Sequence, residues 1–189
     1  MARTKQYDEQ EVIEKAMSLF WRNGYESTSV RMLEKEMGIN QFSIYSSFGS
    51  KHGVFLESLK CYKSKTASVF EKLQNGTGGI NDIKAFFYDS VAMPTKIGEF
   101  HNKGCLLTNT YNEFSNNEDQ LIREQMAEFM ANLKNIFIQK LQLNSAKDAA
   151  TIEKQANYLM LAKHGLAAAS RVNTSKEIQD YIEITFSNL

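Results

Sequence analysis

Seven polar, charged or aromatic side chains stand close together in one short stretch of the sequence. They are Ser29, Arg31, Gln41, Phe42, Ser43, Tyr45 and Lys51. The amide of Gln41 can pair with N6 and N7 of adenine, and the guanidinium of Arg31 with O6 and N7 of guanine. The ring of Phe42 can lie against a thymine methyl group, while the hydroxyls and the ammonium group of Lys51 suit phosphate oxygens. These residue types indicate contacts with duplex DNA.

The elements expected to position these side chains are three helices joined by tight turns. A first helix runs from about Asp8 to Asn23 and ends at Gly24. The second begins near residues 28–29 and stops at Gly38, and the third is capped by Asn40 and ends before residue 49. A helix that ends in glycine, a tight turn and a further short helix together predict a helix-turn-helix motif, whose second helix enters the major groove.

The same stretch resembles the TetR/AcrR family of bacterial repressors over about 50 residues. The matching residues are Ala16, Leu19, Phe20, Gly24, Tyr25, Thr28, Ser29, Val30, Leu33, Gly38, Ile39, Ser43, Ile44, Tyr45, Phe48, Ser50 and Lys51. The sequence departs from the commonest family pattern at Glu34, Glu36, Asn40 and Phe42. These departures concern which DNA sequence is read, not the fold.

The resemblance implies roles for the seven side chains and for the chain as a whole. Gln41 and Arg31 match base-reading positions of the family. The phosphate-contacting positions correspond to Ser29, Ser43, Tyr45 and Lys51. The resemblance also implies repression more often than activation. A second segment, residues 104–110, is similar to one found in an AcrR-like branch of the family.

The rest of the chain is predicted to be helical as well, which makes the fold class all-α. We expect a DNA-binding domain over 1–50, a connecting helix over 51–73, and a dimerisation and ligand-sensing bundle within 51–189. The segment 74–79 is the clearest linker. Further helices are expected at 81–91, 105–114, 118–141, 147–171 and 174–186, with a loop over 93–104.

Composition sets the broad class of the protein. Hydrophobic residues make up 42% of the chain and there is one proline, as expected for long helices around a real core. The net charge is zero, so DNA binding requires local clustering of basic groups. Two cysteines, a polar N-terminus and the lack of a long apolar run favour a cytoplasmic protein without a membrane segment or disulfide framework.

The C-terminal half supplies candidates for a ligand pocket and for a dimer interface. Met and aromatic side chains suit an adaptable apolar cavity for a small-molecule inducer, although several of them are equally suited to a plain core. The pocket candidates are Tyr62, Phe86, Phe87, Cys105, Tyr111, Met126, Phe129 and Phe137. Residues 147–187 are rich in alanine and are expected to form a homodimer, which implies a pseudo-palindromic operator.

Cys105 leaves two alternatives open. It is either a small buried side chain or a reactive thiolate at a helix N-terminus, near His101 and Lys103. A redox-sensing regulator acting through Cys105 is therefore one alternative to reversible ligand control. A helical enzyme or small-molecule carrier is another, but no catalytic residue set is recognisable. No metal site is expected from the spacing of histidines and cysteines, and no cofactor is predicted.

Overall fold

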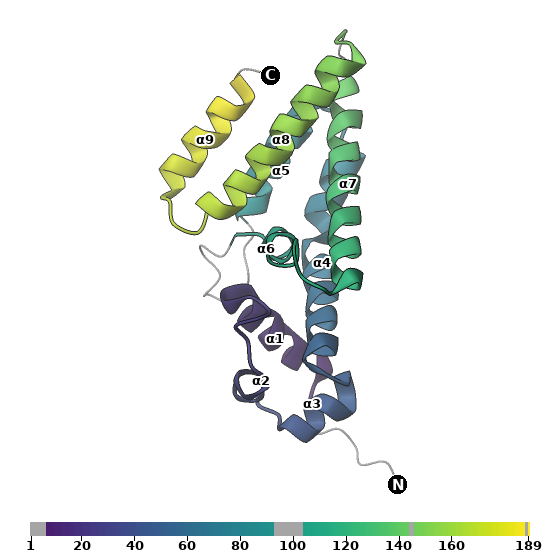
Figure 1. The fold of residues 1–189 in the computed structure, drawn as a ribbon. Coiled ribbons are helices and arrows are strands. Elements are labelled where there is room, and N and C mark those ends of the chain that lie inside the picture. Colours follow the sequence, from purple (N-terminus) through teal and green to yellow (C-terminus); the bar gives the residue numbers. More distant parts are fainter. Residues whose placement is uncertain (1–6, 93–103, 144–145, 188) are drawn as a thin grey trace. The chain divides into compact units, whose positions relative to one another are not determined.

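The structure, a computed structural model, describes residues 7–92, 104–143, 146–187 and 189. The described residues form helices and no strands (Figure 1), so the all-α prediction is confirmed. The helices are α1 (Glu9–Asn23), α2 (Val30–Met37), α3 (Gln41–Phe48), α4 (Lys51–Asn75), α5 (Ile80–Ala92), α6 (Leu106–Glu113), α7 (Gln120–Gln142), α8 (Ala149–Ala169) and α9 (Ser175–Ser187). The expected ranges agree with these to within a few residues. The loop expected at 93–104 lies, apart from Gly104, outside the described residues.

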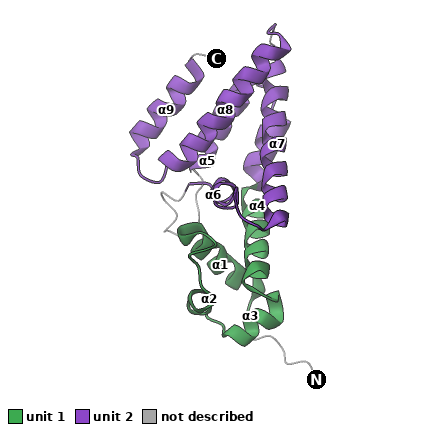
Figure 2. Ribbon diagram, viewed as in Figure 1, with its two compact units in different colours: residues 1–66 green, residues 67–189 purple. Residues whose placement is uncertain are grey.

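The chain divides into two compact units, residues 1–66 and 67–189 (Figure 2). The division falls within α4, the helix expected to connect the two parts of the chain. In the part of the chain that the structure describes, no helix combines the length and the apolar character needed to cross a membrane.

The first unit packs α1 and the start of α4 around a small aromatic core. Phe20 of α1 meets Phe55 of α4 edge to face, with ring centroids 4.9 Å apart. Leu33 of α2 and Ile44 of α3 are fully buried. Burial of these apolar side chains fixes the two short helices, which are too short to be stable alone.

The second unit is a helical bundle in which α7 supplies much of the core. The apolar stripe along this helix lies inside the bundle. Its buried members are Ile122, Met126, Met130, Leu133, Phe137 and Leu141. Phe129 and Ile136 are only partly buried and pack against this core. The apolar face of α7 is therefore mostly core, with two members nearer the surface.

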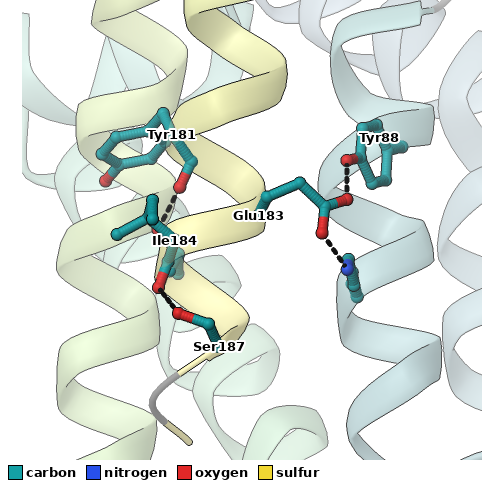
Figure 3. A network of polar contacts seen from close by, with 7 residues as sticks. Tyr88, Tyr181, Glu183, Ile184 and Ser187 are labelled. Atoms are coloured by element: carbon teal, nitrogen blue, oxygen red, sulfur yellow. Dashed lines mark hydrogen bonds and ion pairs between the residues drawn. The ribbon is translucent and has the colours of Figure 1, made fainter.

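Polar contacts hold α9 in place at its start and along its length. Thr174 and Glu177 form a capping box. Glu177 accepts from the Thr174 N–H at 2.8 Å, and Thr174 Oγ1 accepts from the Glu177 N–H at 3.3 Å. Farther along, Glu183 accepts a hydrogen bond from Tyr88 of α5 at 2.5 Å and pairs with Lys84 at 2.7 Å (Figure 3).

The linker after α4 is tied down by a buried lysine. Lys140 of α7 donates to the carbonyls of Gln74 and Gly76, and its Nζ lies 3.4 Å from an Asp82 carboxylate oxygen. A Cβ on Gly76 would lie 2.5 Å from the Asp82 carboxylate, so any other residue at position 76 would force the Asp82 side chain to move. The glycines of this segment thus form a closed turn held by side chains.

Candidate nucleic-acid interface

The turn between α2 and α3 has the geometry that a helix-turn-helix motif requires. Ser29 caps α2 by accepting from the Met32 N–H at 3.2 Å, and Asn40 caps α3 by accepting from the Ser43 N–H at 2.9 Å. Gly38 ends α2 with φ +71°, a left-handed conformation that favours glycine. The expected start and end of these helices are confirmed.

The first turns of α3 present three predicted site residues to solvent. Phe42 is 80% exposed, which is unfavourable for a large apolar ring in water, and Tyr45 is exposed as well. Gln41 is exposed too, and its Nε2 donates to the Tyr45 hydroxyl at 3.1 Å. Ile44 of the same helix is fully buried. The helix therefore has one anchored side and one side open to a partner.

The two acidic residues of α2 have structural partners that sequence reasoning missed. A Glu34 carboxylate oxygen accepts a hydrogen bond from the Gln41 N–H at 2.5 Å. Glu36 forms an ion pair with Arg22 of α1 at 2.6 Å. Glu34 thereby adds a second cap to the helix that presents Gln41. No local spacing rule indicates this bond, because it forms only when the turn brings α3 back toward α2.

Lys51, at the start of α4, is engaged within the first unit. Its Nζ donates to the Tyr25 carbonyl at 3.0 Å and lies 4.1 Å from the centroid of the Tyr25 ring. These contacts fix a positive charge beside the loop between α1 and α2. Side chains held in this way lose less conformational entropy when they meet a phosphate.

The remaining predicted DNA contacts differ in their exposure. Arg31 is exposed on the first turn of α2, and Ser29 is exposed at its cap. Ser43 is only partly exposed on α3. The structure thus places all seven predicted residues in the first unit, on α2 and its cap, on α3 and at the start of α4. It brings Gln41 and Tyr45 into direct contact.

The residues predicted to line a ligand pocket do not all come together. Tyr62 lies in the first unit, packed edge to face on Trp21 with ring centroids 5.1 Å apart. In the second unit, Phe137 contacts both Phe86 and Phe87, at centroid distances of 6.0 and 6.3 Å. All three of these rings are buried.

Two other candidates, Tyr111 and Met126, line an open pocket of about 280 Å³ between α6 and α7, together with Ser115, Arg123, Glu124 and Ala127. Phe129 belongs to the aromatic group rather than to this pocket, since it packs edge to face on Phe70 at 5.4 Å. The centroid of the Tyr111 ring also lies 5.8 Å from the centroid of the His164 ring of α8. The second unit therefore holds a small open pocket as well as an aromatic cluster.

The second unit also contains a half-buried thiol, Cys105, near a buried lysine, Lys163. Cys105 is the N-cap residue of α6, half-buried, and its side chain makes no capping hydrogen bond. Lys163 of α8 is buried, and burial lowers the pKa of its ammonium group, while the nearby Cys105 acts on that pKa in the opposite direction. Burial also lowers the pKa of His164. Lys163 was not among the predicted residues, although apolar neighbours one turn away on both sides could have marked it.

Comparison with known proteins finds similarity to bacterial transcriptional regulators. Residues 12–58 match the sequence pattern of the family described as bacterial regulatory proteins, tetR family. The chain is 27% identical, over the full length of both proteins, to the uncharacterized HTH-type transcriptional regulator YezE of Bacillus subtilis. It is also 36% identical to the HTH-type transcriptional repressor ComR of Escherichia coli, over 36% of this chain and 33% of ComR.

Solved structures show the same fold over almost the whole chain. One is a cysteine mutant of the TetR family transcriptional regulator CifR, complexed with a 26-bp double-strand operator DNA. It has a TM-score of 0.82 and 21% identity, and the match covers 97% of both chains. The reduced form of NemR from Escherichia coli has a TM-score of 0.72 and 18% identity, covering 94% of both chains. Helix order and bundle architecture are therefore shared along the chain.

Proposed function

We propose that this chain, whose residues 12–58 match the tetR family of bacterial regulatory proteins, is a homodimeric repressor that leaves its operator when a small molecule binds. Repression of this kind requires DNA binding and a change of conformation, and it needs no turnover of the ligand. DNA binding, dimerisation and ligand control are each supported by a different part of the chain.

The capped helix-turn-helix with the exposed first turns of α3 carries the assignment. Gln41, Phe42 and Tyr45 project from a helix that Asn40 and Glu34 fix at its N-terminus. Such a helix enters the major groove with its N-terminal residues toward the bases. We propose that Gln41 reads adenine and that the Phe42 ring packs on a thymine methyl group.

Phosphate contacts are proposed for the residues that flank the reading helix. Ser29, Ser43 and Tyr45 supply hydroxyls, and Lys51 supplies a charge that Tyr25 already positions. Contacts of this kind fix the register on the duplex without reading sequence. Arg31, exposed on α2, has the fork geometry suited to guanine.

A homodimer is proposed through α8 and α9. Both helices leave large apolar side chains in water, among them Leu161, 71% exposed, and Ile184, 66% exposed. Tyr158 of α8 and Tyr181 of α9 are exposed as well. A second copy of the chain related by a two-fold axis would cover the same residues on both sides. Two reading helices related by that axis imply a pseudo-palindromic operator.

Ligand control is proposed for the second unit. Its open pocket of about 280 Å³ lies between α6 and α7 and is lined in part by Tyr111 and Met126. An apolar molecule bound beside these side chains favours release of DNA only if it binds more tightly to the conformation that does not fit the operator. Cys105 begins α6, so an electrophile that modified it would act on the same helix.

The test is recovery and sequencing of DNA that the purified protein selects from a pool of random duplexes. We expect a two-fold symmetric sequence, bound at least about 10³-fold more tightly than a shuffled duplex of equal length. Phe42→Ala should reduce the preference at one position in each half-site, whereas the exposed control Val172→Ala, outside the first unit, should not. Recovery of unrelated sequences without symmetry would contradict the proposal.

A further inference from the structure

Lys163 lies on the interior face of α8, where the helix is otherwise apolar. Its neighbours one turn away in each direction, Leu159, Met160, Leu166 and Ala167, are all buried. Lys163 itself is 5% exposed. A lysine at such a position is rare, since its charge must leave water unless it finds a partner.

The described residues offer Lys163 an aromatic neighbour but no carboxylate. Its Nζ lies 5.7 Å from the centroid of the Phe86 ring of α5. The acidic residues of α5 pair with other lysines: Asp82 with Lys140 at 3.4 Å, and Asp89 with Lys72 at 2.6 Å. An aromatic face attracts an ammonium group but does not neutralise it.

Several acidic residues on the other helices of the second unit have partners of their own. Glu153 of α8 pairs with Lys134, and Glu124 of α7 accepts from Gln120. Glu183 of α9 pairs with Lys84. Within the described part of the chain, Cys105 is the ionisable neighbour that favours the charged form of Lys163, and a thiol supplies negative charge only when it is deprotonated.

A buried ammonium group without a fixed counter-charge lowers stability, so a ligand that supplies the missing charge gains from it. We propose that Lys163 recognises the carboxylate of an aromatic acid that binds inside the second unit. The aromatic part of the ligand would lie among the rings near Lys163, where Phe86 packs edge to face on Phe70 at a centroid distance of 5.2 Å and on Phe137 at 6.0 Å. This assignment rests on the proposed ligand control, specifies its chemistry, and places the ligand beside α5 and α8 rather than in the pocket between α6 and α7.

The titration of Lys163 is consistent with this role. Because burial lowers the pKa of Lys163, an adjacent carboxylate would raise it again. Burial, and then the charge of Lys163, lower the pKa of His164, the next residue in the chain, so this imidazole offers no counter-charge to Lys163. Binding of the acid should therefore be accompanied by uptake of a proton at any pH where the amine is partly neutral in the free protein.

The experiment compares thermal unfolding of the full-length wild type and Lys163→Met, without DNA, with benzoate, naphthoate and phenylbutyrate and with the corresponding neutral amides. Methionine keeps the apolar stem of lysine and removes its charge. We expect the ligand-free Lys163→Met protein to unfold about 2–4 °C above the wild type, since an uncompensated buried charge is gone. In the wild type at least one acid should bind about tenfold or more tightly than its amide, and in Lys163→Met this preference should vanish.

Three control variants keep the result decisive. Lys154→Met removes an exposed lysine from the same helix and should change neither quantity. Lys163→Gln provides a second uncharged variant if Lys163→Met does not fold. Cys105→Ser should retain the preference for the acid, because the ligand rather than the thiolate is the proposed counter-charge.

The proposal is overturned if no acid stabilises the wild type more than its amide, or if the preference persists in both uncharged variants. It is also overturned if Cys105→Ser abolishes the preference, since recognition of the acid would then depend on the thiol rather than on Lys163. None of these outcomes affects DNA binding measured without ligand. Failure of the protein to select any operator would instead remove the proposed function and leave the binding measurements intact.

Discussion

At the scale of single residues, Lys51 and Gln41 have different neighbours, and this difference separates two kinds of DNA contact. Lys51 is held by the carbonyl and ring of Tyr25. We expect Lys51→Ala to weaken binding to operator and non-operator duplexes alike and to reduce the slope of log affinity against log salt by about one unit. The measurement is binding over a salt series, with unfolding temperatures recorded to confirm that the loss of the Tyr25 contact leaves the first unit folded.

Gln41 should act on sequence rather than on overall affinity. Removal of its amide by Gln41→Ala should cost about 1–3 kcal/mol at one base pair in each half-site and leave other positions unchanged. The hydrogen bond that Gln41 donates to Glu34 comes from its backbone N–H, so the substitution leaves this bond in place and α3 should stay capped. Binding to a set of singly substituted operators measures this. If Tyr45→Phe combined with Lys51→Ala leaves affinity intact, the reading surface lies elsewhere.

At the scale of helices, the network around Glu183 joins α5 to α9 and should make stability depend on pH. The hydrogen bond to Glu183 raises the pKa of Tyr88 to about 12, above its ordinary value of 10.0. Protonated Tyr88 is therefore favoured in the folded state. Its contribution to stability is complete below pH 10 and is lost as the pH rises toward 12.

Tyr88→Phe tests this dependence. We expect the variant to be slightly less stable than the wild type at about pH 8, and the difference to shrink steadily between pH 10 and 12. Glu183→Gln should instead reduce the loss of stability on acidification, because hydrogen bonds from Lys84 and then Tyr88 lower the pKa of Glu183. Denaturant unfolding at a series of pH values measures the free energy of unfolding of both variants and of the wild type. A difference that stays constant through the alkaline range would mean that Tyr88 does not titrate with folding.

Helix starts were predictable from the sequence wherever the capping residue is local. Asn40 and Thr174 bond to N–H groups three residues ahead, as their types and spacing indicated. The contacts of Glu34 with Gln41 and of Lys51 with Tyr25 were not predictable, because the first spans seven residues across a turn and the second joins distant parts of the first unit. Lys163 was missed although its apolar neighbours one turn away on both sides place it on the buried face of α8, whereas its closeness to Phe86 depends on how α5 packs against α8.

The pocket candidates also show that patterns within one helix are predictable from the sequence, whereas contacts between helices are not. Aromatic and Met residues at helical spacing predicted an apolar interior, and Phe86, Phe87 and Phe137 do meet there. Spacing along one helix does not say which residues of other helices complete a cavity. Hence Tyr62 lies in the first unit, whereas Tyr111 and Met126 line the open pocket.

At the scale of the whole molecule, the exposed apolar side chains of α8 and α9 predict a dimer that a single charge can disrupt. Leu161→Glu places a carboxylate where a two-fold axis would bring two copies together, and it should give a monomer at micromolar concentration. The matched control is Leu121→Glu on α7, where the leucine is also exposed and lies outside α8 and α9. Light scattering after gel filtration measures the mass. A monomeric wild type, or an equal effect of both substitutions, would exclude this interface.

Control of DNA binding by a ligand is a property of the whole chain, because the proposed ligand and operator sites lie in different units. A ligand that lowers operator affinity about 100-fold must favour the released conformation by about 2.7 kcal/mol, which one buried small molecule can supply. Linkage requires the operator to weaken ligand binding by the same factor. Ligand affinity measured with and without operator duplex checks this equality.

The same measurement separates reversible binding from modification of Cys105. A reversible ligand should obey the equality in the wild type and in Cys105→Ser, and operator binding should return on dilution. An electrophile or oxidant should act only on the wild type, should persist on dilution and should add mass to the peptide that contains Cys105. If neither class of compound alters operator affinity or the unfolding temperature, the second unit serves dimerisation alone.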